Sequence, residues 1–112
     1  MSLRSLLTET VTIRNAPTVT DGYNNATLDW AHPTDVTSKA RLEQTLGTEV
    51  TAGRDTAISD WLLVAPAGVP VTAFSRIVRA DQTVFEVVGP PAIYDTPARM
   101  AHIEAHLRHV SG

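Results

Sequence analysis

Apolar and polar positions alternate along much of this chain with a period of two, which is typical of half-buried β-strands. In residues 8–14, branched apolar side chains alternate with threonine and arginine, and β-branched residues favour strands. The alternation resumes over residues 26–30. Residues 21–25, Asp-Gly-Tyr-Asn-Asn, lie between these runs and are turn formers. Together these segments predict a hairpin with a wide tip.

The remaining apolar runs predict further strands. Residues 36–44 carry a weaker alternating pattern, and residues 57–65 are the most apolar segment, which predicts a central strand. Residues 74–79 and 83–88 flank a short loop and predict a second hairpin. The closing segment, residues 100–110, fits one face of a helix as well as one side of a strand. The hairpins that precede it favour the strand.

The predicted fold is mainly β, because short strands follow one another through turns with no alternation of strand and helix. We expect a single domain over residues 1–112, either a small antiparallel β-barrel or a sandwich, with one long polar loop over residues 46–56. Residues 1–7 form either one short amphipathic turn or a flexible arm. The patterns predict six or seven short strands in all.

Composition narrows the possible functions. The net charge is −3 and no basic block is present, which disfavours a protein that binds by gripping phosphates. The absence of cysteine excludes disulfides, thiolate metal sites and thiol catalysis. The longest nearly apolar run, residues 61–70, is broken by proline and glycine and is shorter than the roughly 20 residues of a membrane helix.

Three histidines near the C-terminus, His102, His106 and His109, are the first candidates for chemistry. On a helix they share a face and suit zinc. On a strand, His102 and His106 lie about 13 Å apart at a rise of about 3.3 Å per residue, too far for one metal ion. We therefore expect a solvated strand face with no metal and no cofactor. No nucleophile elbow or phosphate-binding loop is present, so we expect no catalytic residues and no enzyme.

The aromatic residues divide into two kinds. Trp30 and Trp61 lie in strand patterns and are predicted to anchor the core. Tyr23 lies in a polar turn beside Asn24, and aromatic residues are enriched at interface centres. We predict that Tyr23 and Asn24 contact a neighbouring subunit or partner.

The polar loop over residues 46–56 is the segment that we most expect to be functional. It is near the upper length of ordinary connections, where functional loops become more common. Glu49, Arg54 and Asp55 give it mixed charges that suit contacts between subunits. The alternative is a solvated loop without a partner.

The order of these segments resembles the head-tail joining, or head-completion stopper, proteins of long-tailed (siphovirus-type) bacteriophages, especially those of actinobacterial phages. The likeness covers nearly the whole chain. The segments that carry it most clearly are the turn DGYNN followed by Trp30, the strand VFEVVGPP with its proline stop, and the closing strand MAHIEAHLRHV.

The resemblance implies a small β-barrel that assembles as a six-fold or twelve-fold ring in the virion neck, after synthesis in the bacterial host cytoplasm. It implies a portal-adaptor connector protein on the head side and a tail-terminator or tail tube protein on the tail side. Such a ring closes the DNA-filled capsid, docks the tail, and lets DNA pass without binding a specific sequence. It has no membrane partner. Residues 46–56 then point toward the channel.

Other interpretations stay open at this point. A tail-terminator protein is also a small ring former at the same junction. A monomeric β-barrel binding module would need an aromatic-lined groove, and a small enzyme with a histidine metal site would need a C-terminal helix.

Overall fold

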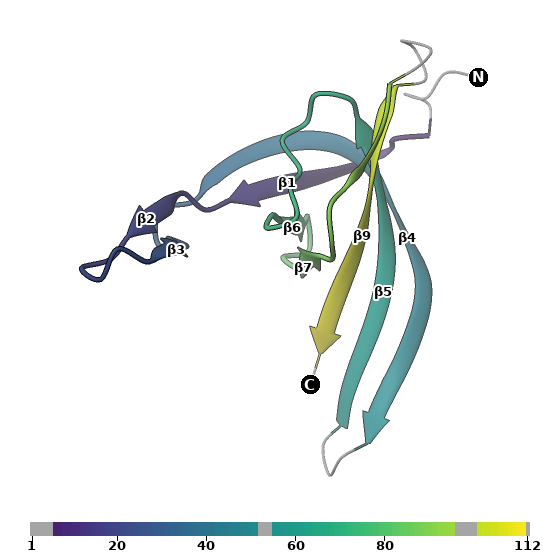
Figure 1. The fold of residues 1–112 in the computed structure, drawn as a ribbon. Helices are drawn as coiled ribbons and strands as arrows, with labels where there is room; N and C mark the ends of the chain where they lie inside the picture. The colour runs from purple at the N-terminus through teal and green to yellow at the C-terminus, as the bar shows by residue number, and fades with distance from the viewer. Residues whose placement is uncertain (1–5, 52–54, 96–100, 112) are drawn as a thin grey trace.

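The computed structural model describes residues 6–51, 55–95 and 101–111 of the chain, and all of its regular elements are β-strands (Figure 1). Within these ranges the strands are β1 (Glu9–Asn15), β2 (Thr18–Thr20), β3 (Ala26–Leu28), β4 (Thr34–Thr51), β5 (Asp55–Pro66), β6 (Arg76–Arg79), β7 (Val84–Val87), β8 (Ala92–Tyr94) and β9 (His102–Ser111). No helix in the described part of the chain is long and apolar enough to cross a membrane.

Six of these strands close into an antiparallel barrel, which confirms the predicted fold class. The order is β5-β4-β1-β6-β7-β9, and β9 pairs back with β5 to complete the circle. β1 lies between two neighbours, with Ile13 opposite Val36 on β4 and opposite Ile77 on β6. β8 pairs with the flank of β9 as an additional strand. Closure leaves the barrel itself with few unpaired strand edges.

The core lies inside the barrel and is formed by alternate residues of its strands, together with Val71 from the loop between β5 and β6. Its buried members are Val11, Ile13, Ala40, Leu63, Ala65, Val71, Ile77, Phe85, Val87, Ile103, Ala105 and Leu107. Trp61 packs against this cluster and meets the Phe85 ring edge-on, with the centroids 5.3 Å apart. The prediction that Trp61 anchors the core is therefore confirmed. Trp30 is only half-buried and lies outside this cluster, so the same prediction for Trp30 is wrong.

The first predicted hairpin is wrong in its pairing. Residues 26–30 do not pair with β1, whose neighbours are β4 and β6. Instead, β2 and β3 form a separate two-stranded sheet around the predicted turn. Pro17 separates β1 from β2, and because proline has no N–H to give to a sheet it marks the place where the chain leaves the barrel.

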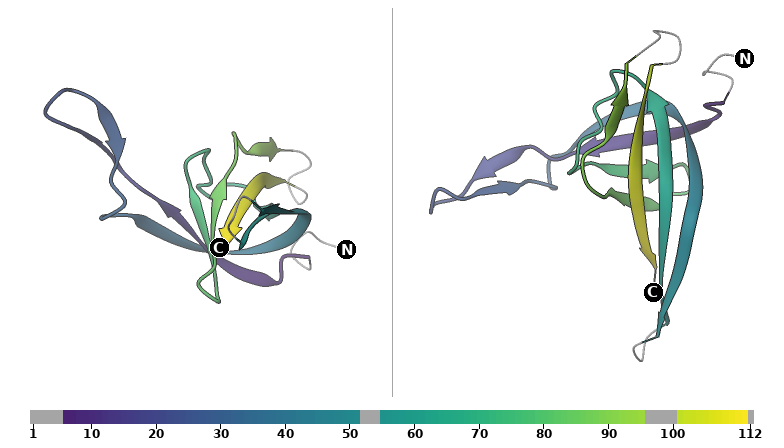
Figure 2. Two further views of the ribbon diagram at one scale, coloured as in Figure 1. Left: turned by 90° about the horizontal axis from the view of Figure 1, so that it is seen from below. Right: turned by 45° about the vertical axis from the view of Figure 1, so that its right-hand side comes forward.

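The long polar loop predicted over residues 46–56 is also wrong. β4 continues to Thr51 and β5 begins at Asp55, with Glu49 opposite Ala57 and Thr51 opposite Asp55. The strands run beyond the barrel as a ribbon, which the right-hand view of Figure 2 shows below the other strands. Backbone pairing holds such a ribbon, so its sequence does not need the alternation of a half-buried strand.

The other predicted strands are confirmed. β5 is central, between β4 and β9, and β6 and β7 form the second hairpin. The closing segment is the strand β9, so the helical alternative is excluded. Residues 1–5 lie outside the described residues, and Leu7, at the end of the predicted arm, is buried.

Candidate assembly surface

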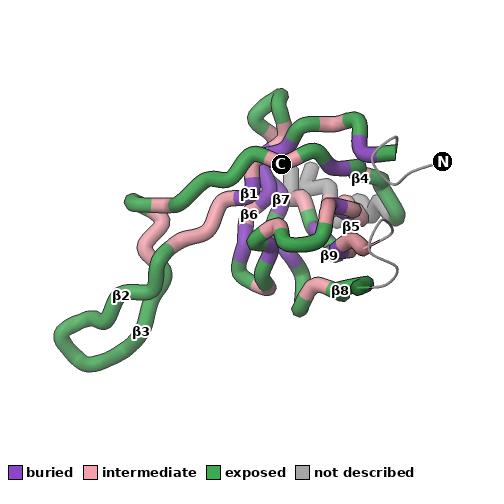
Figure 3. Tube along the Cα trace, turned by 90° about the horizontal axis from the view of Figure 1, so that it is seen from above, coloured by how far each residue is buried: buried purple, intermediate pink, exposed green. Residues whose placement is uncertain are grey.

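The β2–β3 arm, which we define as residues 17–28, extends away from the barrel (Figure 1). Every residue of the arm is exposed, as the unbroken green of its tube in Figure 3 shows. It nevertheless carries three large apolar side chains, Val19, Tyr23 and Leu28. An isolated two-stranded hairpin is marginally stable in water, so a partner that covers these apolar side chains would stabilise the arm.

Asp21 organises the tip of the arm. Its carboxylate accepts hydrogen bonds from the backbone N–H groups of Asn25, at 2.9 Å, and Tyr23, at 2.8 Å. These bonds, with that to Asn25 the stronger influence, hold the pKa of Asp21 below its ordinary value. Asn24 takes the left-handed conformation that asparagine tolerates, with φ of 65°. The turn leaves Tyr23 89% exposed at the end of the arm.

The base of the arm is closed by a second aspartate. The backbone N–H of Asp29 donates to the carbonyl of Pro17 at 2.8 Å, which ties the two ends of the arm together. The Asp29 carboxylate pairs with Nδ1 of His32 at 2.8 Å, and this hydrogen bond holds the pKa of Asp29 below its ordinary value. A carboxylate therefore lies at the tip of the arm, and a second one, paired with His32, lies just beyond its base.

A groove lined by aromatic, aliphatic and charged side chains runs along the base of the arm. Leu28 and Phe74 line both of two adjoining hollows of about 210 and 260 Å³. Trp30 lies in the first hollow with the Arg76 guanidinium 3.8 Å from its ring centroid, within cation–π distance. Phe74 is 71% exposed, which is unusual for a phenylalanine.

The loop that presents Phe74 is anchored by hydrogen bonds to one buried side chain, that of Ser75. Ser75 is 2% exposed; its hydroxyl donates to the side-chain oxygen of Asn15 and accepts from the N–H of Thr72 at 2.8 Å. The Asn15 amide in turn donates to the carbonyl of Pro70 at 2.8 Å. These bonds fix the loop to β1, so Phe74 is held outward by the fold.

The second exposed apolar surface is the β8 edge, which we define as Val88 together with β8. Val88, Ile93 and Tyr94 are all exposed, with Ile93 at 69%. Tyr94 stacks on the ring of His102 with the centroids 4.7 Å apart. No described strand pairs with the outer side of β8, so its backbone groups remain open on that side.

A shallow hollow of about 450 Å³ lies beside this edge. It is lined by Thr45, Asp60, Val88, His106, Leu107 and Arg108. Nε of Arg108 donates to the Asp60 carboxylate at 3.2 Å, and the Thr45 hydroxyl donates to the Asp60 carbonyl at 3.0 Å. The hollow therefore combines an ion pair, a hydroxyl and a histidine with apolar side chains.

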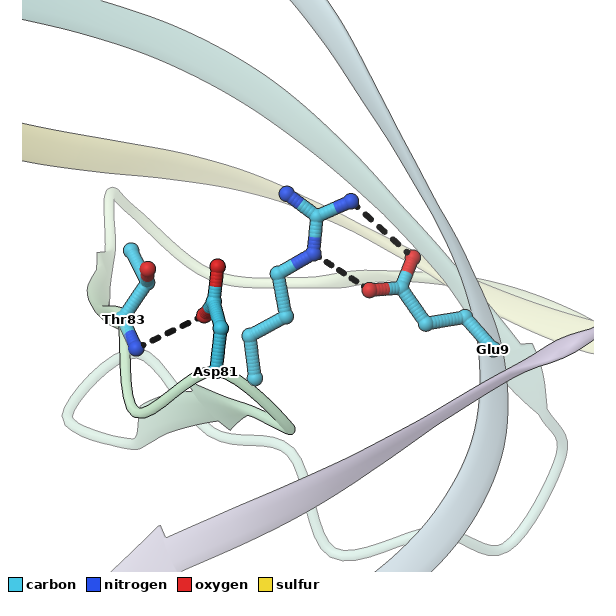
Figure 4. Close-up of polar contacts among 4 residues, drawn as sticks. Glu9, Asp81 and Thr83 are labelled. Atoms are coloured by element: carbon cyan, nitrogen blue, oxygen red, sulfur yellow. Dashed lines mark hydrogen bonds and ion pairs between the residues drawn. The ribbon is translucent and has the colours of Figure 1, made fainter.

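A charged cluster joins β1 to the β6–β7 turn (Figure 4). Arg79 pairs with Glu9, and this hydrogen bond raises the pKa of Arg79. The Asp81 carboxylate accepts from the N–H of Thr83 at 2.9 Å, and hydrogen bonding to Thr83 lowers the pKa of Asp81. The ion pair between Arg79 and Glu9 joins β6 to β1.

The β9 histidines do not gather as metal ligands. His102 pairs with Glu104 at 2.9 Å, and Nδ1 of His109 contacts the carbonyl of Val84 at 3.2 Å. His106 is exposed on the same strand. Over residues 6–51, 55–95 and 101–111, no three side chains of His, Asp or Glu come together in a way that could hold a metal ion.

The predicted contact residues fall on two separate projections. Tyr23 and Asn24 lie together at the tip of the arm. Glu49 and Asp55 belong to the ribbon of β4 and β5, while Arg54 lies outside the described residues. The sequence predictions missed the exposed apolar residues on the rest of the surface, Phe74, Val88, Ile93 and Tyr94. The sequence did offer one signal of their exposure, since all four lie within four residues of a proline at position 70, 90 or 91, where strands end.

Comparison with known proteins gives a likeness of fold. No protein-family model matches the chain, and no curated protein matches it. A chain of a solved structure described as "Virion of native gene transfer agent (GTA) particle" superposes with a TM-score of 0.68 at 17% identity. The two chains share a fold. The match covers 94% of this chain and 96% of that chain, so the likeness extends over the whole domain.

Proposed function

We propose that this chain is a structural protein of a virion and that it acts as a stopper at the head-tail junction. The observation that carries the proposal is the fold shared, over nearly the full length of both chains, with a chain of the gene transfer agent virion. The order of segments that resembles phage head-tail joining proteins supports the finer position in the neck.

The shape of the subunit supports a role in assembly. Two projections leave one small barrel, the β2–β3 arm and the β4–β5 ribbon, and the principal extents of the molecule are 48, 39 and 22 Å. A ring of identical subunits needs two different patches on each copy that meet head to tail. The arm and the β8 edge offer two such patches.

In this proposal the ring is six-fold or twelve-fold. It lies between a portal-adaptor connector protein and a tail-terminator or tail tube protein. The β4–β5 ribbon points toward the channel through which DNA passes. A net charge of −3 suits a collar that must not hold the DNA.

A monomeric binding module is the second candidate, and the groove at the base of the arm favours it. Leu28, Trp30 and Phe74 line that groove, and aromatic-lined hollows of this kind take peptides or small ligands. A tail-terminator ring is a neighbouring alternative that uses the same surfaces at the same junction.

The test shortens the ribbon without disturbing the barrel. Replacing residues 49–57 by Asn-Gly joins the paired residues Thr48 and Ile58 through a two-residue hairpin turn. The gene is removed from the phage that encodes it, and wild-type and shortened chains are supplied in trans. A control chain carries Thr10→Ser on the barrel, where the side chain is exposed.

Without the gene, we expect DNA-filled heads that leak or lack tails, and we expect the shortened chain to restore particles poorly although it folds. Electron microscopy of the particles measures both outcomes. Normal infectious particles without any supplied chain would refute the stopper proposal and favour the binding module. Full rescue by the shortened chain would show that the β4–β5 ribbon is not needed for the function.

A further inference from the structure

The arm has the chemistry of a surface that another molecule covers. Its large apolar side chains, Val19, Tyr23 and Leu28, are all exposed, and no strand in the described part of the chain pairs with either outer edge of its two-stranded sheet. Unpaired strand edges seek partner strands. The arm is therefore suited to adding to the edge of another sheet.

The β8 edge, like the arm, exposes large apolar side chains, and no described strand pairs with its outer side. β5 pairs with one flank of β9 along its whole length, so β7, Val88 and β8 must share the other flank. The N–H of Val88 donates to the carbonyl of His106, and β8 pairs at residues 102–104. Val88 and β8 thus lie about 10 Å apart along β9, at about 3.3 Å per residue, and form one apolar strip.

The two surfaces lie on different sides of the barrel. In Figure 3 the arm leaves the barrel on one side while β8 lies across from it. One copy therefore cannot satisfy its own β8 edge with its own arm. A second copy can, and the contact is then heterologous, with different patches meeting head to tail.

Charge supports a second copy as the occupant. Residues 15–38 contain no lysine or arginine; Asp21 gives the tip of the arm its negative charge, and Asp29, paired with His32, lies just beyond its base. Beside the β8 edge, His106 and Arg108 lie on β9; the Arg108 guanidinium has five N–H donors, one of which goes to Asp60. Asp60 and Glu104 also lie beside this edge, but they are paired with Arg108 and His102. The further N–H donors of Arg108 and the His106 ring are left to meet an acidic arm.

We propose that the β2–β3 arm of one copy docks on the β8 edge of a second copy and extends its sheet. This proposal deepens the proposed function, on which its place in a virion rests, by naming the partner of the arm. The arm and the edge are smaller than the 20–30 residues a side of a standard interface, so a single contact is weak. A closed ring, in which every copy makes two such contacts, stabilises each of them.

The chain contains no cysteine, which permits a direct test by cross-linking. Tyr23→Cys marks the arm and Ile93→Cys marks the β8 edge. The two purified variants are mixed at high concentration and treated with a short bis-maleimide cross-linker. Val84→Cys, an exposed valine on β7, is the matched control for the edge.

We expect the mixture of Tyr23→Cys and Ile93→Cys to give cross-linked dimers at several times the yield of either variant alone or of Tyr23→Cys mixed with Val84→Cys. Equal dimer yield from Tyr23→Cys alone would show arm-to-arm pairing and overturn the proposal, as would a mixture no better than the Val84→Cys control. Ala92→Cys marks the same edge if Ile93→Cys does not fold.

These outcomes are separate from those of the proposed function. If purified copies cross-link as expected but the chain is absent from virions, the arm contact stands and the stopper role is refuted. A chain present at the head-tail junction that gives no arm-to-edge product would preserve the role and refute this contact.

Discussion

The barrel and the β2–β3 arm differ in where their stability comes from. In the barrel, side chains such as Ile13, Leu63 and Phe85 are almost completely buried. In the arm, no residue is buried, and the tip is held by hydrogen bonds to the Asp21 carboxylate. Burial of apolar surface is the dominant favourable term in folding, so the stability of the domain comes mainly from the barrel and little of it from the arm.

This difference agrees with the proposed role of the arm in assembly. A segment that does not stabilise its own domain, yet exposes apolar side chains, is better explained by an interaction than by folding. The two regions should therefore respond oppositely to mutation, the barrel in stability and the arm in assembly.

The largest effect is expected from Phe85→Ala, which leaves a cavity beside Trp61 in the barrel. We expect the free energy of unfolding to fall by about 3–5 kcal/mol, measured by chemical denaturation. Phe74→Ala is the matched control, because its ring is exposed at the base of the arm, and it should change stability by less than about 0.5 kcal/mol. Equal losses for the two variants would show that the arm base belongs to the core.

The barrel strands could be predicted where pairing is local and one face is buried. β7 met both conditions, since a short turn joins it to β6 and its buried residues alternate with exposed ones, whereas β6 met only the first, because Ile77 and Val78 are both buried. The neighbours of β1 could not be predicted, because β4 and β6 lie far away in the sequence and alternation does not specify a partner.

The candidate surface could be predicted only at the tip of the arm. Tyr23 and Asn24 stood out as an aromatic residue and an asparagine in a polar turn. Ile93 did not stand out, because an isoleucine after two prolines reads equally well as buried. Its exposure follows from the position of β8 outside the closed barrel, which is a property of the tertiary fold.

A smaller effect is expected from Ser75→Ala, which removes the buried hydroxyl that joins the Phe74 loop to β1. The N–H of Thr72 and the side chain of Asn15 would lose a partner, at a cost of about 1–3 kcal/mol. Ser38→Ala is the control, because the Ser38 hydroxyl, among the described residues, bonds only the carbonyl of its neighbour Lys39, and this variant should lie within about 0.5 kcal/mol of wild type. Thermal unfolding of both variants measures the difference, and a neutral Ser75→Ala would show that the loop needs no such anchor.

The tip of the arm should loosen in acid while the barrel persists. The folded-state pKa of Asp21 lies below its ordinary value of 3.8, so its stabilising contribution is present above that value and is lost as the pH falls through the folded-state pKa. We expect the amide signals of Tyr23 and Asn25 to shift in this acidic range in an NMR titration. Asp21→Asn should abolish that dependence, and unchanged titration in this variant would assign it to another group.

The smallest effect on stability is expected from Tyr23→Ala. The side chain is almost fully exposed, so the free energy of unfolding should change by no more than about 0.5 kcal/mol. The arm-to-edge contact should nevertheless weaken, measured as a lower cross-linking yield when Tyr23→Ala is combined with Val19→Cys and mixed with Ile93→Cys. A large loss of stability would place Tyr23 among the folding residues instead.

The most direct test of the stopper role is to find the chain in purified particles. An antibody to the folded chain, labelled with gold, is applied to tailed particles and to heads separated from tails, and both are imaged by electron microscopy. The account predicts label at the head-tail junction and at the vertex of separated heads. Particles that lack the chain, or carry it only at the tail tip or over the capsid surface, would contradict it.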